Sequence, residues 1–466
     1  MKRTRIVATI GPASCSAQKL LKMISGGMNV ARLNFSHGSY EEHAKFIAAI
    51  RLAARRAKRT VTIMQDLSGP KVRVGELPPE GLKLEEGEKI VFSNNPKVKG
   101  AIPFGYTGLT RDVGRGDTIL LDDGLLEVVV LNTTSTEISA RVVVGGLLTS
   151  HKGMNVPSAS LRIPAITEKD KRDLEFGLEH GVDWVALSFV RDPRDIQQLR
   201  TLIAKHKPKH TPKIIAKIEK HEAIKHLVEI VHAADGIMIA RGDLGVETPP
   251  ESVPLVQKRI IKMCRAVNKP VIVATQMLDS MIRNPRPTRA EVSDVALAVF
   301  DGADATMLSG ESASGKYPIE AVEMMARVIG AVENPDAVHE SFLCDHTIIE
   351  EPDQILSYIG AIASELNHAK AIIVSHKNIE LVPILSHFRP SAAIFVQVAS
   401  EFEGAQINFH FGVYPFRVRS LTDSHLVRSV VKEARTAGLV EAHDRIVILE
   451  KSKKEPFFSI REVEVK

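Results

Sequence analysis

The chain has 466 residues, of which 44% are hydrophobic and 25% charged, so it is long enough for two or three globular domains with large cores. No run of residues is long and apolar enough to cross a bilayer, and the N-terminus reaches Gly11-Pro12 too soon for a signal peptide. The net charge of +5 suits anionic ligands but, without interleaved aromatic and basic residues, does not indicate nucleic-acid binding. The three cysteines lack metal-type spacing, which favours a reducing, cytoplasmic location.

Short apolar runs of strand length alternate with amphipathic helical segments through the first 332 residues, apart from one insertion. The strands are expected at residues 6–9, 30–35, 61–64, 185–189, 214–218, 236–240, 271–274 and 305–308. Helices are expected at 17–24, 41–57, 193–205, 221–232, 253–267 and 319–332, with one begun at 167–170 and one ending at 300. Ser39 with Glu42, and Thr288 with Glu291, have the spacing of capping boxes. Eight strands alternating with helices predict an α/β fold, a parallel (β/α)₈ TIM barrel.

Polar side chains follow these strands at their carboxyl ends, where such barrels place their catalytic groups. The bias is not expected of a purely structural barrel. The residues concerned are Arg32, Asn34, Ser36, His37, Asp66, Ser188, Lys217, Glu219, Arg241, Asp243, Thr275, Gln276, Ser309 and Glu311.

The segment 213–247 has the most informative pattern, a strand, a helix and a second strand. Lys217 and Glu219 interrupt the first strand two residues apart, so they face the same side. Asp243 follows the second strand, and two carboxylates beside an ammonium suit Mg²⁺ and a phosphorylated substrate. A bare K-x-E could also be an outward salt bridge on a solvated strand, but Asp243 and the neighbouring strand ends favour a site.

Residues 70–162 and 335–466 have different periodicities from the barrel. The first region contains a predicted hairpin at 119–131 around Asp122-Asp123-Gly124 and a strand at 137–144, which indicates a small all-β lid domain. The second has a helix at 355–366 and strands at 371–374, 393–398, 415–418 and 446–449, so we expect an α/β domain for regulation or assembly. The barrel would then comprise residues 1–69 and 163–334.

Several long ungapped segments are similar to signatures of the pyruvate kinase family. They are TRIVATIGPAS, NVARLNFSHG, KGMNVP, IIAKIEKHEAI, DGIMIARGDLGVE, KPVIVATQMLDSMI and RPTRAEVSDVALAVFDGADATMLSGESASGKYPIEAV. The resemblance extends along the whole chain and is strongest in the barrel. It implies transfer of a phosphoryl group from phosphoenolpyruvate to ADP, giving pyruvate and ATP in the last step of glycolysis.

The resemblance also implies roles for individual residues. Lys217 would stabilise the transferring phosphoryl group and Arg32 would contact it, while Glu219 and Asp243 would bind Mg²⁺ or Mn²⁺. The Gly242 and Asp243 amides would bind the substrate carboxylate. Thr275, with Ser309 and Glu311, would belong to the path that protonates the enolate. The nucleotide contacts would be Asn34, Ser36, His37, Arg73 and Lys152; His37 could equally be an ordinary capping residue.

One departure concerns the monovalent cation. Familiar members require K⁺ and carry Glu where this chain has Lys71, whereas this chain resembles the branch that works without K⁺. A tethered ammonium could replace the ion's charge, although the family's K⁺-site residues Asn34, Ser36, Asp66 and Leu67 are retained. We therefore expect K⁺ not to be required.

A second departure lies in the C-terminal region. Glu380 follows the first strand there, and residues 451–456 replace a glycine-rich loop, so activation by fructose 1,6-bisphosphate is not expected. The family resemblance implies a homotetramer. Two alternatives stay open: a Mg²⁺-dependent barrel aldolase or lyase that forms a pyruvate enolate, and a non-catalytic metabolite-binding protein.

Overall fold

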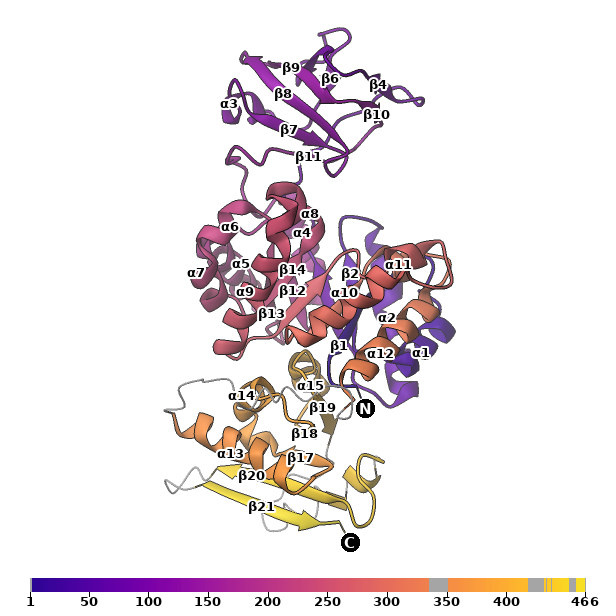
Figure 1. Ribbon diagram of the computed structural model, residues 1–466, viewed down its shortest axis with the longest axis vertical. Coiled ribbons are helices and arrows are strands. Elements are labelled where there is room, and N and C mark those ends of the chain that lie inside the picture. The colour runs from indigo at the N-terminus through magenta and orange to yellow at the C-terminus, as the bar shows by residue number, and fades with distance from the viewer. Residues whose placement is uncertain are drawn as a thin grey trace.

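The centre of the molecule is a closed barrel of eight parallel strands, which confirms the predicted fold class (Figure 1). The computed structural model describes residues 2–334, 351–417, 431–451 and 458–465, apart from 433 and 437. Around the barrel the strands run in the order β1, β16, β15, β14, β13, β12, β3, β2. Their bounds are β1 (Arg5–Thr9), β2 (Val30–Asn34), β3 (Thr62–Asp66), β12 (Trp184–Leu187), β13 (Lys213–Ile218), β14 (Gly236–Ala240), β15 (Val271–Ala274) and β16 (Ala305–Leu308).

The strands are almost wholly buried because both of their faces are covered, as in other parallel sheets. In β1, for example, Val7 packs inside the barrel with Met64 and Met238, whereas Ile6 and Ala8 pack in the cluster shared with the surrounding helices. Only the strand ends are left for polar chemistry.

The helices surround the barrel, and both predicted capping boxes are confirmed. The longer helices are α1 (Ala17–Gly26), α2 (Tyr40–Ala57), α4 (Glu168–Glu179), α5 (Pro193–His206), α9 (Val253–Ala266), α10 (Arg289–Phe300) and α12 (Pro318–Val332). The shorter ones are α6 (His221–Lys225), α7 (Leu227–Ala233), α8 (Arg241–Glu247), α11 (Gly310–Ala313), η1 (Pro250–Ser252) and η2 (Asp279–Ile282). The prediction of one helix over 221–232 was wrong: His226, at φ −109° and ψ 23°, separates α6 from α7, although the apolar spacing continues across it.

The inserted segment forms the all-β unit at the top of Figure 1. Its main sheet has the order β11-β7-β8-β9-β5-β6, with β10 and β4 paired beside it. The predicted hairpin is confirmed, because β7 pairs antiparallel with β8 around Asp122 and Asp123, both at positive φ. The elements are β4 (Leu82–Leu84), β5 (Lys89–Ser93), β6 (Ile102–Pro103), α3 (Leu109–Asp112), β7 (Thr118–Leu121), β8 (Leu126–Thr133), β9 (Glu137–Val144), β10 (Gly146–Leu148) and β11 (Met154–Asn155).

The C-terminal α/β unit lies against the opposite end of the barrel (Figure 1). Phe409 stacks edge-on against Trp184 at 4.9 Å between ring centroids, and the Arg389 guanidinium lies 3.0 Å from the Asp304 carboxylate. Trp184 begins a barrel strand and Asp304 precedes one, so this unit closes the amino ends of the strands.

The sheet of this unit has the order β19-β18-β17-β20-β21. Its last strand, which was not predicted, is antiparallel to β20. The elements are α13 (Pro352–Leu366), β17 (Ala371–Val374), η4 (His376–Asn378), α14 (Leu381–His387), β18 (Ala393–Val398), α15 (Glu401–Ile407), β19 (Val413–Arg417), β20 (Arg445–Lys451) and β21 (Phe458–Glu464). Residues 335 and 452–456, on which a domain boundary and most of the loop prediction rest, lie outside the described residues. The domain boundaries therefore stay predictions.

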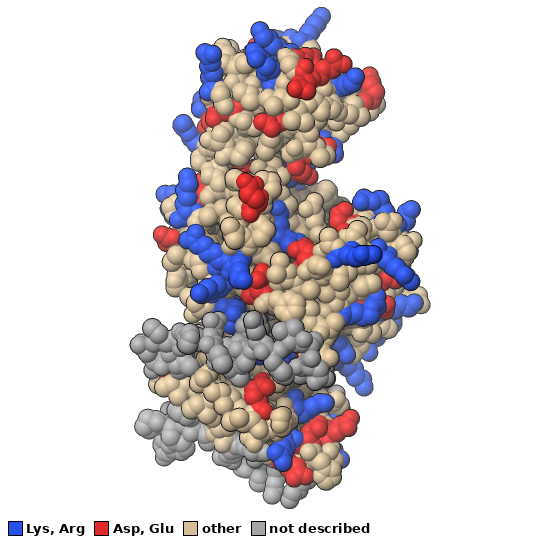
Figure 2. All heavy atoms as spheres, viewed as in Figure 1, with Lys and Arg blue, Asp and Glu red and all other residues tan. Residues whose placement is uncertain are grey.

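None of the helices in the described part of the chain is long and apolar enough to span a membrane. Lysines and arginines are mixed with acidic residues on the face shown in Figure 2, in keeping with the small net charge of +5.

Candidate active site

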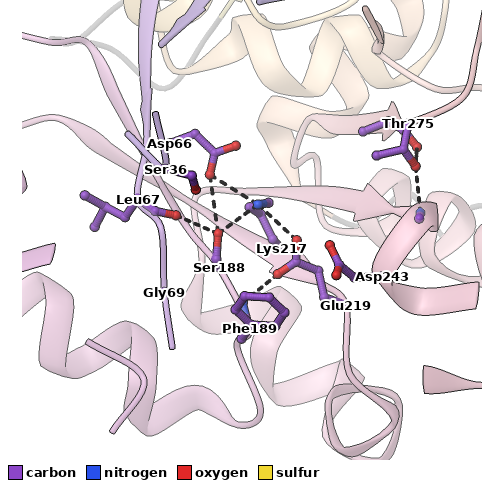
Figure 3. A network of polar contacts seen from close by, with 12 residues as sticks. Ser36, Asp66, Leu67, Gly69, Ser188, Phe189, Lys217, Glu219, Asp243 and Thr275 are labelled. Atoms are coloured by element: carbon purple, nitrogen blue, oxygen red, sulfur yellow. Dashed lines mark hydrogen bonds and ion pairs between the residues drawn. The ribbon is translucent and has the colours of Figure 1, made fainter. Parts of the chain in front are cut away.

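Lys217 lies at the carboxyl end of β13, inside a ring of polar groups from neighbouring strands (Figure 3). Its ammonium is 2.9 Å from a Glu219 oxygen, 3.2 Å from an Asp66 oxygen and 2.8 Å from the Ser188 hydroxyl. Burial would lower the pKa of Lys217, but the Asp66 and Glu219 carboxylates outweigh it and hold the pKa above its ordinary value. The predicted site therefore contains a buried, charged ammonium.

The two carboxylates around this ammonium have different environments. Burial raises the pKa of Glu219, and the negative charge of Asp243 adds to the effect. Its second oxygen accepts a hydrogen bond from the Phe189 amide at 2.7 Å. Burial also acts on Asp66, but Lys217 and Arg32 outweigh it and hold the pKa of Asp66 below its ordinary value.

Arg32, in the middle of β2, is the second cation of the site. Its Nε donates to Asp66 at 2.7 Å and its Nη1 donates to the Thr9 hydroxyl at 2.9 Å. Two donors in fixed directions hold the guanidinium at one orientation beside Lys217. Sequence reasoning missed the part played by Thr9; the only signal was its place at the end of a barrel strand.

Asp243 lies in the first turn of α8, with its carboxylate beside that of Glu219 (Figure 3). The Lys71 ammonium contacts it at 2.9 Å and reaches Asp123 of the β unit at 3.3 Å. Burial would lower the pKa of Lys71, but these two carboxylates raise it above its ordinary value. No hydrogen bond or ion pair within the described residues joins Lys71 to Asn34, Ser36 or Asp66, so its charge is directed to the predicted Mg²⁺ ligand.

Thr275 follows β15 in a strained backbone conformation, with φ 71°, and Gln276 has φ 54°. Its hydroxyl accepts a hydrogen bond from the Gly242 amide at 2.7 Å and donates to the Ala274 carbonyl at 2.6 Å. The structure thus brings Thr275 to the start of α8. Its hydroxyl accepts the hydrogen bond of the Gly242 amide, the group that was expected to bind a substrate carboxylate.

Ser309 and Glu311 follow β16, with Gly310 between them. The Glu311 carboxylate accepts hydrogen bonds from the Ser309 amide at 2.7 Å and from the Leu278 amide at 3.2 Å. Burial raises the pKa of Glu311. A carboxyl group that is buried and held at both oxygens links the loops after β15 and β16.

The predicted nucleotide residues form two groups. The Asn34 side chain accepts a hydrogen bond from the Ser36 amide at 3.2 Å. The Ser68 hydroxyl donates one to the Ser36 hydroxyl at 2.9 Å, and His37 follows in the same loop. Arg73 donates to the His151 carbonyl at 2.9 Å, and Lys152 pairs with Asp122 at 2.8 Å. The first group belongs to the barrel and the second to the β unit, which is joined to the barrel site here through Lys71.

Comparison with known proteins gives a consistent result. A family model described as the pyruvate kinase barrel domain matches residues 1–322, and one described as the pyruvate kinase alpha/beta domain matches residues 353–457. The chain belongs to the pyruvate kinase family.

Individual relatives support this assignment. The chain is 44% identical over 456 residues to a pyruvate kinase of Geobacillus stearothermophilus, covering 96% of this chain and 77% of the relative. It is 40% identical over 454 residues to a pyruvate kinase of Clostridium acetobutylicum, covering 96% of both chains. The crystal structure of a pyruvate kinase from Cryptosporidium parvum superimposes with a TM-score of 0.92 at 34% identity, covering 100% of this chain and 96% of that chain.

Membership of the pyruvate kinase family makes the chain a phosphotransferase and confirms the predicted enzyme class. The aldolase and the non-catalytic binding protein are not supported. Pyruvate kinases use phosphoenolpyruvate and ADP and generally require Mg²⁺ and K⁺.

Proposed function

We propose that Lys217 and Arg32 carry the transfer of a phosphoryl group from phosphoenolpyruvate to ADP. The observation that supports this most strongly is the charged Lys217 ammonium, buried between Asp66, Ser188 and Glu219. Phosphoryl transfer requires positive charge around the equatorial oxygens and in-line positioning, with little covalent work for the protein. Lys217 supplies that charge, and the doubly held Arg32 orients the phosphoryl group.

Glu219 and Asp243 fit a divalent cation. Both offer the carboxylate oxygens that Mg²⁺ and Mn²⁺ prefer, and each is neutralised by an ammonium, Lys217 or Lys71. When bound, the cation supplies positive charge for the substrate's carboxylate, phosphoryl and developing enolate oxygens. Lys217 and Lys71 would then turn from these carboxylates toward the phosphoryl group.

The Gly242 and Asp243 amides bind the substrate carboxylate in this proposal. The Gly242 amide becomes available when the Thr275 hydroxyl, 2.7 Å away, turns from it toward the methylene carbon of the substrate. Thr275 then belongs to the protonation path, with Ser309 and Glu311 behind it. Burial raises the pKa of Glu311, in the direction of the range that proton relays use.

The nucleotide would lie between the barrel and the β unit. Asn34, Ser36 and His37 approach it from the barrel, while Arg73 and Lys152 approach it from the β unit. Lys152 is 40% exposed at its side chain, so it can leave Asp122 for a phosphate at little cost.

We further propose that Lys71 makes the activity independent of K⁺. Its ammonium lies within the cluster that contains the proposed metal ligand Asp243, where it supplies positive charge beside the phosphate site. A Lys71→Glu variant should acquire a K⁺ requirement, and Lys71→Met should lose activity without regaining it on addition of K⁺. If Lys71→Glu is equally active with and without K⁺, the role of Lys71 is wrong.

Two properties of the assembly are also proposals. The chain forms a homotetramer, which sedimentation velocity measures directly. Fructose 1,6-bisphosphate does not activate it, because the exposed Glu380 would oppose a phosphate at the first loop of the C-terminal unit. A clear fall in the KM for phosphoenolpyruvate on adding the bisphosphate would refute the second proposal.

The primary test is pyruvate and ATP formation from phosphoenolpyruvate and ADP with Mg²⁺. Parallel reactions contain K⁺ or tetramethylammonium at equal ionic strength. Equal rates support both the reaction and the role of Lys71, and turnover only with K⁺ removes the Lys71 proposal alone. Absence of turnover in both would contradict the assignment of these residues.

A further inference from the structure

A second cluster of possible ligand atoms lies beside the proposed catalytic site and does not include its residues. His221 and Glu222 begin α6, and Glu247 ends α8, the helix whose first turn contains Asp243. One ligand atom from each of the three residues lies within 4.8 Å of the others. The proposed phosphoryl transfer uses none of the three.

The atoms that converge here have no hydrogen-bond partners. His221 Nδ1, Glu222 Oε2 and Glu247 Oε2 are all buried, and none of them makes a hydrogen bond. Nδ1 lies 3.2 Å from the Glu222 oxygen and 3.7 Å from the Glu247 oxygen, yet its geometry is that of a hydrogen bond to neither. Buried polar atoms in folded proteins almost always make a hydrogen bond, so three converging atoms without one are candidate ligand atoms for a cation.

The Glu247 carboxylate is held in place from its other side. Its Oε1 accepts a hydrogen bond from Asn155 at 2.7 Å and lies 2.7 Å from the Lys220 ammonium. The side chain is fully buried, so these two contacts fix the direction of the unpaired Oε2. Outer contacts of this kind orient metal ligands in proteins.

The charge of the cluster also suits a cation. The carboxylates of Glu222 and Glu247 converge here beside a single ammonium, that of Lys220, so acidic groups outnumber fixed cations around the three ligand atoms.

We propose that His221, Glu222 and Glu247 bind one transition-metal dication of the Zn²⁺ class. One imidazole nitrogen and two carboxylate oxygens form a ligand set typical of Zn²⁺, with a fourth position left for water. Mg²⁺ prefers oxygen ligands alone, so this site would differ in selectivity from the pair Glu219 and Asp243.

The ion would connect the β unit to the barrel. Asn155 belongs to β11 of the β unit and holds Glu247, while α6 and α8 lie at the end of the barrel that faces this unit (Figure 1). Occupancy would therefore stabilise the connection between β11 and α8, separately from any phosphoryl transfer.

Co²⁺ is a suitable spectroscopic probe for this site. The metal-free full-length protein is titrated with Co²⁺ in excess Mg²⁺, and binding is followed by visible absorption and calorimetry. We expect one Co²⁺ per chain with the intense bands of a four- or five-coordinate ion, displaced by one equivalent of Zn²⁺. His221→Ala, which changes a partly exposed side chain, should weaken binding at least tenfold. Asn155→Ala should weaken it about tenfold, as expected for loss of an outer contact.

Two control variants separate this site from others. Glu219→Gln, in the proposed Mg²⁺ site, should leave the Co²⁺ spectrum unchanged. His443→Ala, which alters an exposed pair of His443 and Glu464 at 2.9 Å, should also leave it unchanged. The proposal is overturned if the wild-type protein binds no Co²⁺ in excess Mg²⁺, if His221→Ala binds it equally well, or if Glu219→Gln abolishes the bands.

Discussion

Removal of the Lys217 ammonium should separate catalysis from metal binding. In Lys217→Met, a side chain of similar length removes the charge that lies 2.9 Å from Glu219 and 3.2 Å from Asp66. Loss of a preorganised charge at a phosphoryl group costs about 10³-fold in kcat, or ~4 kcal/mol of transition-state stabilisation. Glu219 loses its competing cation at the same time, so the affinity for Mg²⁺ should rise.

The assay compares kcat for pyruvate formation with the Mg²⁺ affinity measured by calorimetry on the same preparations. Asp66 keeps the Arg32 guanidinium at 2.7 Å, so the folded state retains one partner for its buried carboxylate. Lys45→Met, at an exposed position on α2, is the control and should change neither quantity. A loss of kcat below tenfold, or a parallel loss of Mg²⁺ affinity, would refute the assignment of Lys217.

Three further predictions concern charge at defined positions. Arg32→Lys should lower kcat/KM for phosphoenolpyruvate about 10- to 100-fold, because one ammonium cannot reproduce the two directed contacts of the guanidinium; unchanged kinetics would contradict this. Burial raises the pKa of Asp183 to about 7, so the folded state binds this proton more tightly than the unfolded chain, and stability is lost as pH rises from about 4 to 7. Asp183→Asn should abolish that loss, about 3 kcal/mol between pH 5 and pH 8 in urea unfolding; equal pH dependence would refute it. Arg389→Met should lower the unfolding free energy by about 3 kcal/mol, because the buried Asp304 carboxylate loses its cation. Denaturant unfolding measures this change, and an unchanged unfolding free energy would contradict the prediction.

The barrel could be predicted from the sequence because local patterns determine its elements. Strands buried on both faces appear as short apolar runs, and the polar residues that interrupt or end them, such as Lys217 and Asp243, identify the carboxyl ends. The capping boxes and the hairpin around Asp122 and Asp123 are likewise encoded within a few residues.

The parts that could not be predicted depend on contacts between distant segments. The approach of Lys71 to Asp243 joins residues 172 positions apart, and no local pattern encodes it. The break at His226 interrupts an apolar spacing that would suit one continuous helix. The hydrogen bond from the Gly242 amide to Thr275 depends on a strained backbone that propensities do not predict.

Glu219 and Asp243 are the residues proposed to hold the divalent ion near bound phosphoenolpyruvate. Paramagnetic relaxation of the substrate's ³¹P nucleus by Mn²⁺ tests this claim directly, since the effect falls steeply with distance. We predict strong relaxation in the wild-type protein and a loss of at least tenfold in Glu219→Gln, whereas Glu247→Gln retains it. Equal relaxation in the wild-type protein and Glu219→Gln would contradict the claim.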